Sequence, residues 1–345
     1  MKISNFEIGG KKTFIIAELS ANHGNDINIA KKTIKAAKEA GADAIKLQTY
    51  TADTITMDCD NEYFRLDNGS IWDGRFLYDL YKEAHTPWEW HEELINYANK
   101  IGIICFSSPF DQTAVDLLEK FSVPAYKIAS FEITDIPLIE YVASKGKPII
   151  ISTGIATIGD IEDAIQACKR MNNNQIILLK CTSEYPANIE DANLLTMQNF
   201  KLTFNVEVGL SDHTLGTVVP VTSVALGAKV IEKHFILDKS IGGPDSSFSL
   251  DKEEFKEMVE AVRSAEKALG NVSYELTDKK KNNRLYARSL FAVKDIKEGE
   301  AFTKDNVRSI RPGYGLSPKY SKEVYGSFAL KDIQRGTPLD WKLVK

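Results

Sequence analysis

The chain has 345 residues, of which 43% are hydrophobic and 26% are charged, and its formal net charge is -5. This composition is typical of a globular protein, and the length favours one large domain of about 250 residues followed by a smaller one. No apolar run approaches the roughly 20 residues that a bilayer-spanning helix needs, so we do not expect a membrane protein. The negative charge argues against a nucleic-acid partner, because nucleic-acid-binding proteins usually carry a basic face.

The cysteines and the amino-terminal segment indicate a cellular compartment. The four cysteines, Cys59, Cys105, Cys168 and Cys181, have no CxxC spacing, and scattered free thiols are common in reducing compartments. We therefore expect neither a disulfide nor a cysteine-bound metal. The segment 1–6 lacks the apolar core of an export signal, which makes the cytoplasm the expected location.

Short apolar runs alternate with helical patterns from residue 13 to about residue 270. The apolar runs predict eight strands, at residues 13–18, 44–48, 102–107, 125–130, 148–153, 176–182, 206–211 and 229–234. Helical spacing predicts helices that include 27–40, 88–100, 158–171 and 252–269. Repeated βα units indicate a parallel sheet, and eight is the strand number of a TIM barrel. We predict a (β/α)8 barrel over residues 1–272.

The remainder of the chain has a different pattern. A charged stretch at 277–284 interrupts the βα alternation, and we expect a linker over 273–285. Short apolar runs at 290–293, 301–303, 307–311 and 328–330 follow, separated by turn signals. They predict a small β-rich domain over 286–345.

One connection in the predicted barrel is unusually long. It covers residues 50–87, contains Trp72 and several other aromatic residues, and follows the carboxyl end of a strand. Connections of this length are usually lids or binding loops, and the carboxyl ends of the strands form the catalytic face of a TIM barrel. We expect this segment to cover the active site.

Polar side chains share one face near the ends of three predicted strands, as the pairs Ser211 and His213, Glu232 and His234, and Lys46 and Gln48. Two histidines at neighbouring strand ends are candidate ligands of a divalent metal. Because only two protein ligands are evident, octahedral Mn²⁺ or Mg²⁺ suits the site better than tetrahedral Zn²⁺. Asp212 or Asp245 is a candidate for an added carboxylate. His85 and His91 flank a helix start and are better explained as structural residues.

Two lysines, Lys46 and Lys127, are expected at the same rim as Ser130 and Ser152. A buried lysine without an anionic partner is costly, so the pattern favours a phosphate or carboxylate ligand. A lysine that forms a Schiff base remains an alternative.

Glu18 and Glu132 each lie at or just past the end of a predicted strand. Either carboxyl is a candidate acid or base if neighbouring charges tune its pKa. Salt bridges from these glutamates to the two lysines would instead give the lysines a structural role, and this alternative stays open.

The motifs in chain order are Ile-Ile-Ala-Glu18-xxx-Asn22-His23, Ile-Lys46-Leu-Gln48, Ser107-Ser-Pro-Phe110, Lys127-Ile-Ala-Ser130-x-Glu132, Ile-Ser152-Thr-Gly154, Cys-Thr182-Ser-Glu-Tyr185-Pro, Gly-Leu-Ser211-Asp-His213-Thr, Ile-Glu232-Lys-His234-Phe and Gly-Pro244-Asp245. Along the whole chain they resemble the sialic acid synthase family. The tail, with Arg311-Pro-Gly-Tyr-Gly-Leu-Ser-Pro, is similar to the antifreeze-like (SAF) domain that ends those enzymes.

The resemblance implies condensation of phosphoenolpyruvate with an open-chain amino-sugar aldehyde, which gives a nine-carbon 2-keto acid and phosphate by C–O cleavage. It implies that His213 and His234 hold Mn²⁺ or Mg²⁺ as a Lewis acid and that Glu18 and Glu132 act as acid and base. The residues implied to bind phosphoenolpyruvate are Lys46, Lys127, Ser130, Ser152, Ser183 and Ser211. Those implied to address the sugar are Tyr185, Asp245 and Arg311, and Gln48 and Glu232 complete the candidate substrate site.

The resemblance also implies an assembly and a branch of the family. Arg311 of the small domain would reach the barrel of the other subunit in a domain-swapped homodimer. The first motif departs from the Glu-Ala-Gly-Val-Asn-His of the N-acetylneuraminate branch, and Ser183 replaces its usual asparagine. The segments Trp72-Asp-Gly and 86–91 resemble the pseudaminic acid synthase branch, which implies a 6-deoxy diacetamido sugar and a role in flagellar or cell-surface glycosylation.

Three alternatives remain open. The first is the same chemistry on N-acetylmannosamine or on the legionaminate precursor. The second is a metal-dependent aldolase that uses free pyruvate. The third is a non-catalytic sugar-binding protein.

Overall fold

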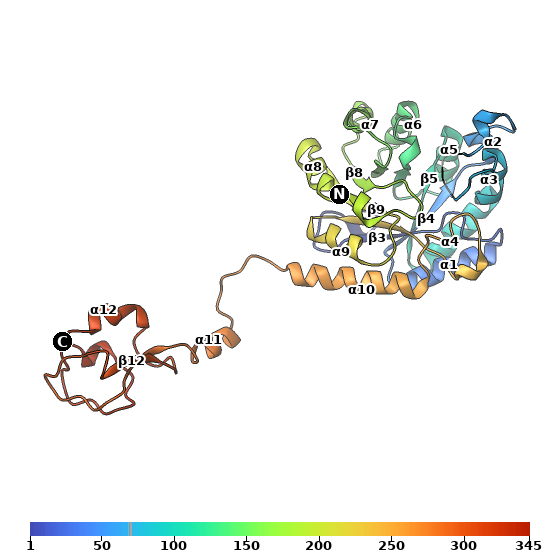
Figure 1. Ribbon diagram of the computed structural model, residues 1–345. Coiled ribbons are helices and arrows are strands. Elements are labelled where there is room, and N and C mark those ends of the chain that lie inside the picture. Colours follow the sequence, from blue (N-terminus) through green and yellow to red (C-terminus); the bar gives the residue numbers. More distant parts are fainter. Residues whose placement is uncertain (68, 70) are drawn as a thin grey trace. The chain divides into compact units, whose positions relative to one another are not determined.

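The computed structural model describes residues 1–67, 69 and 71–345 (Figure 1). The chain forms two compact units, Met1–Gly270 and Asn271–Lys345. Within the part of the chain that the structure describes, no helix is long and apolar enough to cross a membrane.

The first unit is a closed barrel of eight parallel strands (Figure 1). The strands follow one another around the barrel in chain order, and the last pairs with the first. They are β3 (Phe14–Glu18), β4 (Ala44–Thr49), β5 (Ile104–Pro109), β6 (Tyr126–Ile128), β7 (Ile149–Ser152), β8 (Ile176–Cys181), β9 (Glu207–Asp212) and β10 (Val230–His234). The predicted (β/α)8 barrel is therefore confirmed. Each of the eight predicted strands corresponds to one of these.

Helices surround the barrel because each buries one apolar face against the strands. They are α1 (Ile27–Glu39), α4 (His91–Ile101), α5 (Gln112–Lys120), α6 (Ile136–Ala143), α7 (Ile158–Arg170), α8 (Leu195–Phe204), α9 (Val218–Ala225) and α10 (Lys252–Leu269). Side-chain caps fix several helix starts: Asp26 accepts from the Asn28 amide, and Asp251 accepts from the Glu254 amide. The helix expected from residue 88 begins as a short 3-10 turn, η2 (Trp88–Trp90), before α4.

The predicted strand at 125–130 is shorter in the structure. Strand β6 ends at Ile128, and the chain turns into a 3-10 helix, η3 (Ser130–Glu132). The Ser130 hydroxyl accepts a hydrogen bond from the Gly154 amide at 3.1 Å, which ties this turn to the end of β7. Ser130 and Glu132 therefore lie on a turn above the barrel strands rather than in one.

An amino-terminal hairpin was absent from the predicted elements. It consists of β1 (Lys2–Ile3) and β2 (Phe6–Glu7), and its Ile3 side chain is completely buried. Two-residue strands are too short to give a hydrophobic alternation, so no periodic signal marks them.

The long connection after β4 is partly regular. It contains α2 (Ala52–Ile55), the 3-10 helix η1 (Glu62–Phe64) and α3 (Leu77–Ala84). Residues 68 and 70 of this connection lie outside the described residues. The short turns η4 (Ile189–Ala192) and η5 (Lys239–Ile241) follow β8 and β10.

The second unit has its own small hydrophobic core, which includes Leu290, Phe302 and Val307. An antiparallel pair, β11 (Ser289–Ala292) and β12 (Val307–Ile310), lies beside the short helix α12 (Ser321–Val324) and the 3-10 turns η6 (Pro318–Tyr320) and η7 (Trp341–Leu343). The strands expected at 301–303 and 328–330 are reduced to isolated bridges, between Ala301 and Phe328 and between Ala329 and Val344. Helix α11 (Asp278–Arg284) lies in the segment expected to be a linker.

Candidate active site

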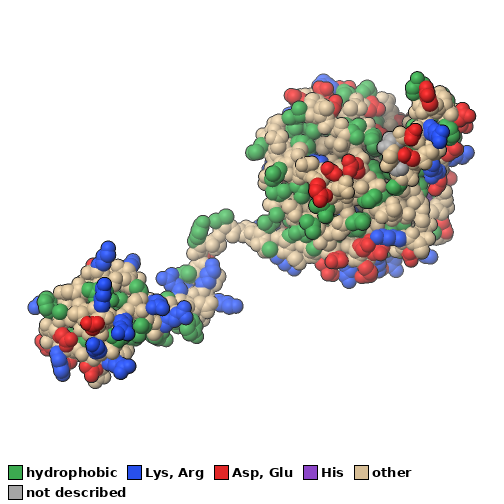
Figure 2. All heavy atoms as spheres, in the orientation of Figure 1, with side chains coloured by type: hydrophobic (Ala, Val, Ile, Leu, Met, Phe, Trp, Pro, Cys, Tyr) green, Lys and Arg blue, Asp and Glu red, His purple; other side chains and the backbone are tan. Residues whose placement is uncertain are grey.

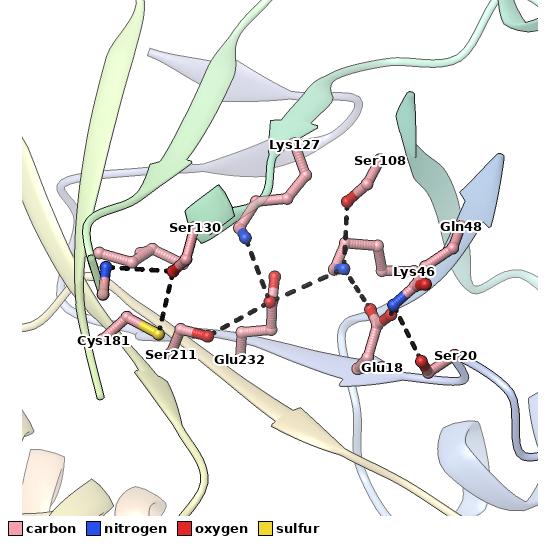
Figure 3. A network of polar contacts seen from close by, with 12 residues as sticks. Glu18, Ser20, Lys46, Gln48, Ser108, Lys127, Ser130, Cys181, Ser211 and Glu232 are labelled. Atoms are coloured by element: carbon pink, nitrogen blue, oxygen red, sulfur yellow. Dashed lines mark hydrogen bonds and ion pairs between the residues drawn. The ribbon is translucent and has the colours of Figure 1, made fainter. Parts of the chain in front are cut away.

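The carboxyl ends of β3, β4 and β10 bring an ion-pair network into the barrel (Figure 3). Glu18 is the register partner of Lys46 on one side and of His234 on the other. The Lys46 ammonium group forms an ion pair with the Glu18 carboxylate and donates to the Ser108 hydroxyl at 3.2 Å. Both charged side chains are almost completely buried. The network therefore places paired charges in a site that is shielded from solvent.

Glu232 joins the two lysines (Figure 3). Its Oε1 atom lies 3.4 Å from Lys127 Nζ and 3.7 Å from Lys46 Nζ, and it also accepts from the Ser211 hydroxyl at 3.4 Å. The salt-bridge alternative is thus realised for Lys46 with Glu18. For Lys127 the partner is Glu232 rather than Glu18 or Glu132, as far as the described residues show.

The pKa values in this network separate into two groups. Burial raises the pKa of Glu18 to about 7, although the neighbouring Lys46 charge opposes the shift. Burial also acts against ionisation of Glu232, but the Lys127 and Lys46 charges outweigh it and lower the pKa of that carboxyl. Burial lowers the pKa of Lys127. Glu232 is therefore the resident anion, while Glu18 can change its protonation state near neutral pH.

Gln48 holds the Glu18 carboxylate in place. Its amide nitrogen donates to Glu18 Oε1 at 2.9 Å and to the Ser20 hydroxyl at 2.8 Å. This arrangement directs Glu18 toward Lys46. In the structure Gln48 contacts a candidate acid or base rather than an open pocket.

Glu132 is a second carboxyl that titrates near neutral pH. It ends η3, and burial raises its pKa to about 7 against the opposing charge of Lys127. Its Oε2 atom is buried and has no hydrogen-bond partner among the described residues. A carboxyl with these properties suits proton transfer to a bound molecule.

Hydroxyl and sulfur groups lie at or just after the ends of β6, β7 and β8. The Ser130 hydroxyl donates to Cys181 Sγ at 3.4 Å, and Ser183 Oγ lies 3.8 Å from the same sulfur. Ser152 Oγ is buried and has no hydrogen-bond partner among the described residues, so it is free to donate to a ligand. Ser152 thus offers a donor to an anion, while the Gly154 amide and the Ser130 hydroxyl already donate to Ser130 Oγ and Cys181 Sγ.

Cys181 was not among the predicted site residues. Burial would raise its pKa, but the hydrogen bond and charge of His213 lower the pKa of this thiol to about 6. The sequence signal was its position directly before Thr182, at the end of a predicted strand. The spacing of the cysteines along the chain could not predict that Cys181 lies beside His213.

His213 and His234 lie side by side at the ends of β9 and β10, with ring centroids 5.3 Å apart. His213 Nδ1 lies 2.8 Å from the Thr182 carbonyl oxygen, so this nitrogen carries the proton and donates. His234 Nδ1 is buried without a hydrogen-bond partner among the described residues, and it lies 3.8 Å from Asp245 Oδ2. Burial lowers the pKa of His234 well below its usual value. A neutral imidazole with an unpartnered buried nitrogen fits a divalent metal.

The carboxylate suggested for such a metal is better supplied by Asp245 than by Asp212. Asp212 pairs with Lys233 at 2.5 Å on the opposite face of the strand, so it does not point toward the histidines. Among the described residues, no group of three or more histidine, cysteine or acidic side chains is arranged to hold a metal ion. A metal at the histidine pair would therefore need ligands from water or substrate.

Aromatic side chains surround the histidine pair. The ring of Tyr185 lies 4.5 Å from that of His213, and the ring of Phe248 lies 4.9 Å from that of His234, measured between centroids. Trp72 from the long connection packs against Tyr185 at 5.5 Å and donates from its indole nitrogen to the Pro244 carbonyl at 3.1 Å. Phe248 was missed because a single phenylalanine in a turn carries no motif.

Arg311 is not part of the barrel unit. It lies in the second unit, directly after β12, and its side chain is exposed. The other predicted residues of the barrel lie within the strands, at their carboxyl ends or in the connections that follow them.

Comparison with known proteins places this site in a family. Residues 33–274 match the NeuB family, and residues 287–345 match the SAF domain. The chain is 53% identical over 339 residues to a pseudaminic acid synthase of Campylobacter jejuni, with 98% of each chain covered. It is 50% identical over 326 residues to a pseudaminic acid synthase of Helicobacter pylori, covering 94% of this chain and 96% of the relative.

More distant relatives share the architecture. An N,N'-diacetyllegionaminic acid synthase of Legionella pneumophila is 38% identical over 355 residues, with 99% of each chain covered. The crystal structure of an N-acetylneuraminic acid synthetase from Leptospira borgpetersenii in complex with citrate is 33% identical and matches with a TM-score of 0.73, covering 82% of this chain and 94% of that one. The predicted family resemblance is confirmed: the chain belongs to the NeuB family and ends in a SAF domain.

Proposed function

We propose that the chain is a pseudaminic acid synthase. It condenses phosphoenolpyruvate with 2,4-diacetamido-2,4,6-trideoxy-β-L-altropyranose and water to give pseudaminic acid and inorganic phosphate. The observation that carries this proposal is the near full-length identity to two pseudaminic acid synthases, which exceeds the identity to a legionaminic acid synthase.

The buried lysines supply the charge that binds phosphoenolpyruvate. Lys46 and Lys127 share one full counter-anion, Glu232, because burial holds the pKa of Glu18 near neutrality. An entering phosphate or carboxylate group adds the missing negative charge. The Ser152 hydroxyl would donate to its oxygens, and the Ser130 hydroxyl and the Gly154 amide would do so by exchanging their bonds to Cys181 Sγ and Ser130 Oγ.

The reaction forms one C–C bond and one C–O bond and breaks another C–O bond. Carbon 3 of phosphoenolpyruvate attacks the aldehyde carbon of the open-chain sugar, water adds to carbon 2, and phosphate leaves carbon 2 with its bridging oxygen. The oxygen of the attacking water becomes the keto oxygen at carbon 2, so water loses both of its protons: the aldehyde oxygen gains one, and the departing phosphate takes the other. Glu18 and Glu132, whose pKa values both lie at about 7, are the residues that donate and accept these protons.

The metal proposed for this site is Mn²⁺ or Mg²⁺, held by His213 and His234. The unpartnered Nδ1 atom of His234 supports this assignment. When bound, the metal supplies Lewis-acid polarisation of the aldehyde oxygen. The aromatic residues Tyr185, Phe248 and Trp72 would pack against the sugar and exclude water from the reacting groups.

The proposed assembly is a domain-swapped homodimer in which Arg311 of one chain serves the barrel of the other. Charge supports it: residues 271–345 contain 16 lysines and arginines against 9 acidic residues, whereas the rest of the chain contains 27 against 39. Figure 2 shows basic side chains prominent on the second unit and acidic ones on the barrel unit. Opposite charges favour association of the two kinds of unit.

We also propose a cytoplasmic location and a role in flagellin or cell-surface glycosylation. The free state of all four cysteines is consistent with a reducing compartment. The glycosylation role depends on the proposed product alone.

The experiment that tests the reaction uses phosphoenolpyruvate labelled with heavy oxygen at the bridging position. C–O cleavage transfers the label to inorganic phosphate, which mass spectrometry detects. Unlabelled phosphate would contradict the mechanism. Product formation from free pyruvate without phosphate release would show an aldolase instead.

A further inference from the structure

The residues that directly precede the two histidines form an ion pair on the outer face of the barrel. Asp212 and Lys233 are register partners on β9 and β10, and the distance from Lys233 Nζ to Asp212 Oδ2 is 2.5 Å. Their side chains are 2% and 0% exposed. Because side chains alternate along a strand, this pair points away from the face that carries His213 and His234.

The same pair holds the residue that follows His213. The Thr214 amide and hydroxyl donate to Asp212 Oδ1 at 3.0 and 2.9 Å. The Lys233 ammonium group donates to the Thr214 carbonyl oxygen. All three polar groups of Thr214 are therefore bound by Asp212 and Lys233, and His213 lies between two anchored residues.

This geometry links the backbones of β9 and β10 at the position of the histidines. If either strand end moved, a buried ion pair would separate, and separation of buried charges is costly. The His213 ring is further oriented by its bond to the Thr182 carbonyl, and the His234 carbonyl accepts from the Leu250 amide at 3.0 Å. The ion pair joins the two histidine-bearing strands on their outer face, while the Ser211 hydroxyl and Glu232 join them on the inner face.

We propose that Asp212, Lys233 and Thr214 are positioning residues that set the separation of His213 and His234, and with it their affinity for a divalent metal. This inference rests on the proposed metal site. Residues outside the ligand set commonly control metal affinity by orienting the ligands.

A general stabilising role would make a different prediction, and the chain offers a matched control. Arg263 and Asp43 form an ion pair of 2.7 Å with side chains 20% and 10% exposed. Arg263 also donates to the Thr13 carbonyl, which places this pair at the opposite, amino-terminal end of the strands. Loss of this pair should lower stability without changing the histidines.

The test is titration of the metal-free full-length protein with Mn²⁺, with free Mn²⁺ measured by electron paramagnetic resonance. We expect Lys233→Met and Thr214→Val to weaken Mn²⁺ binding by about tenfold or more. Thr214→Ser retains the hydroxyl and should bind as the unmodified protein does. Arg263→Met should also bind normally, although thermal unfolding should show a loss of stability.

Each outcome decides the inference. Unchanged Mn²⁺ affinity in Thr214→Val and in any folded Lys233→Met protein would overturn it and leave the pair a structural role. If Lys233→Met does not fold, the difference in Mn²⁺ affinity between Thr214→Val and Thr214→Ser decides whether the inference holds. If the unmodified protein binds no Mn²⁺, or if His213→Ala binds it equally well, the proposed metal site fails and the inference fails with it.

Discussion

Glu18 and Lys46 form a buried ion pair between neighbouring strands, and both side chains are at most 4% exposed. The pair is also the point at which the candidate acid or base meets the candidate phosphate-binding cation. A change in the charge of one side chain therefore changes the electrostatic interaction that acts on the other.

We predict that Lys46→Met strongly weakens phosphoenolpyruvate binding and destabilises the protein. Removing one partner of a buried ion pair typically costs about 3–5 kcal/mol. The double variant Glu18→Gln with Lys46→Met should recover much of the stability but none of the activity. Urea unfolding and KM measurements separate these effects. Lys252→Met, which removes an ion pair to Glu39 at the surface, serves as the control and should change neither. Full activity of Lys46→Met would refute the assigned role.

We predict that Glu132→Gln lowers kcat but stabilises the protein at alkaline pH. The pKa of Glu132 rises from 4.5 in the unfolded chain to about 7 in the folded protein. Between these values the folded state binds more protons than the unfolded state, so the Glu132 contribution to stability falls as pH rises. A glutamine does not ionise, so Glu132→Gln does not lose stability in this way. Its free energy of unfolding should exceed that of the unmodified protein by an amount that grows from pH 5 to a plateau above pH 7, of up to about 3 kcal/mol.

Unfolding free energies measured at several pH values test this expectation for Glu132. Glu190→Gln, at an exposed carboxyl, is the control for the loss of a surface carboxylate. A Glu132→Gln protein that loses stability as pH rises, relative to the unmodified protein, would contradict the sign. The pH profile of kcat should also lose an ionisation near pH 7 in this variant.

We predict that Trp72→Ala raises KM for the sugar more than KM for phosphoenolpyruvate. Trp72 packs on Tyr185 and Phe248, which surround the histidine pair and are proposed to pack against the sugar, whereas the two lysines are proposed to bind phosphoenolpyruvate. Trp72→Phe should retain more activity, because it keeps an aromatic ring but loses the hydrogen bond to the Pro244 carbonyl. Steady-state kinetics with each substrate varied in turn test the split. Equal effects on both KM values would argue against a specific contact with the sugar.

We predict that two inactive variants complement each other if Arg311 serves the partner's barrel. His213→Ala damages the barrel site, and Arg311→Ala damages the small unit. In mixed dimers one complete site forms per heterodimer, so random association should restore about a quarter of full activity. The comparison is with each variant alone and with a chain that carries both substitutions. Absence of restored activity in isolated heterodimers would contradict the exchange of Arg311.

The barrel could be predicted because its strands are buried on both faces and read as apolar runs. Much of the site followed, since parallel strands bring their carboxyl ends to one rim, where Lys46, Glu18 and His234 now lie side by side. The pairing of Lys127 with Glu232 could not be predicted, because its partner comes from a strand more than 100 residues away. Spacing along the chain does not specify which of several carboxylates is nearest.

Other features could not be predicted from the sequence, for different physical reasons. Lys233 alternates with Glu232 and His234 along its strand and therefore points outward, but its burial and its pairing with Asp212 depend on the packing of the outer layer. Phe248 approaches His234 through the fold of an irregular turn. The end of β6 at Ile128 depends on hydrogen bonds from a neighbouring strand end, which local propensity does not include.

The measurement that tests the central claim most directly is phosphate release from phosphoenolpyruvate in the presence of Mn²⁺, with and without a chelator. The sugars to compare are the 6-deoxy diacetamido altrose, N-acetylmannosamine and the legionaminate precursor. We predict chelator-sensitive release with the altrose sugar and a much lower kcat/KM with the other two. Comparable release with N-acetylmannosamine or the legionaminate precursor would contradict the substrate assignment, and release with none of the three would contradict the proposed enzyme itself.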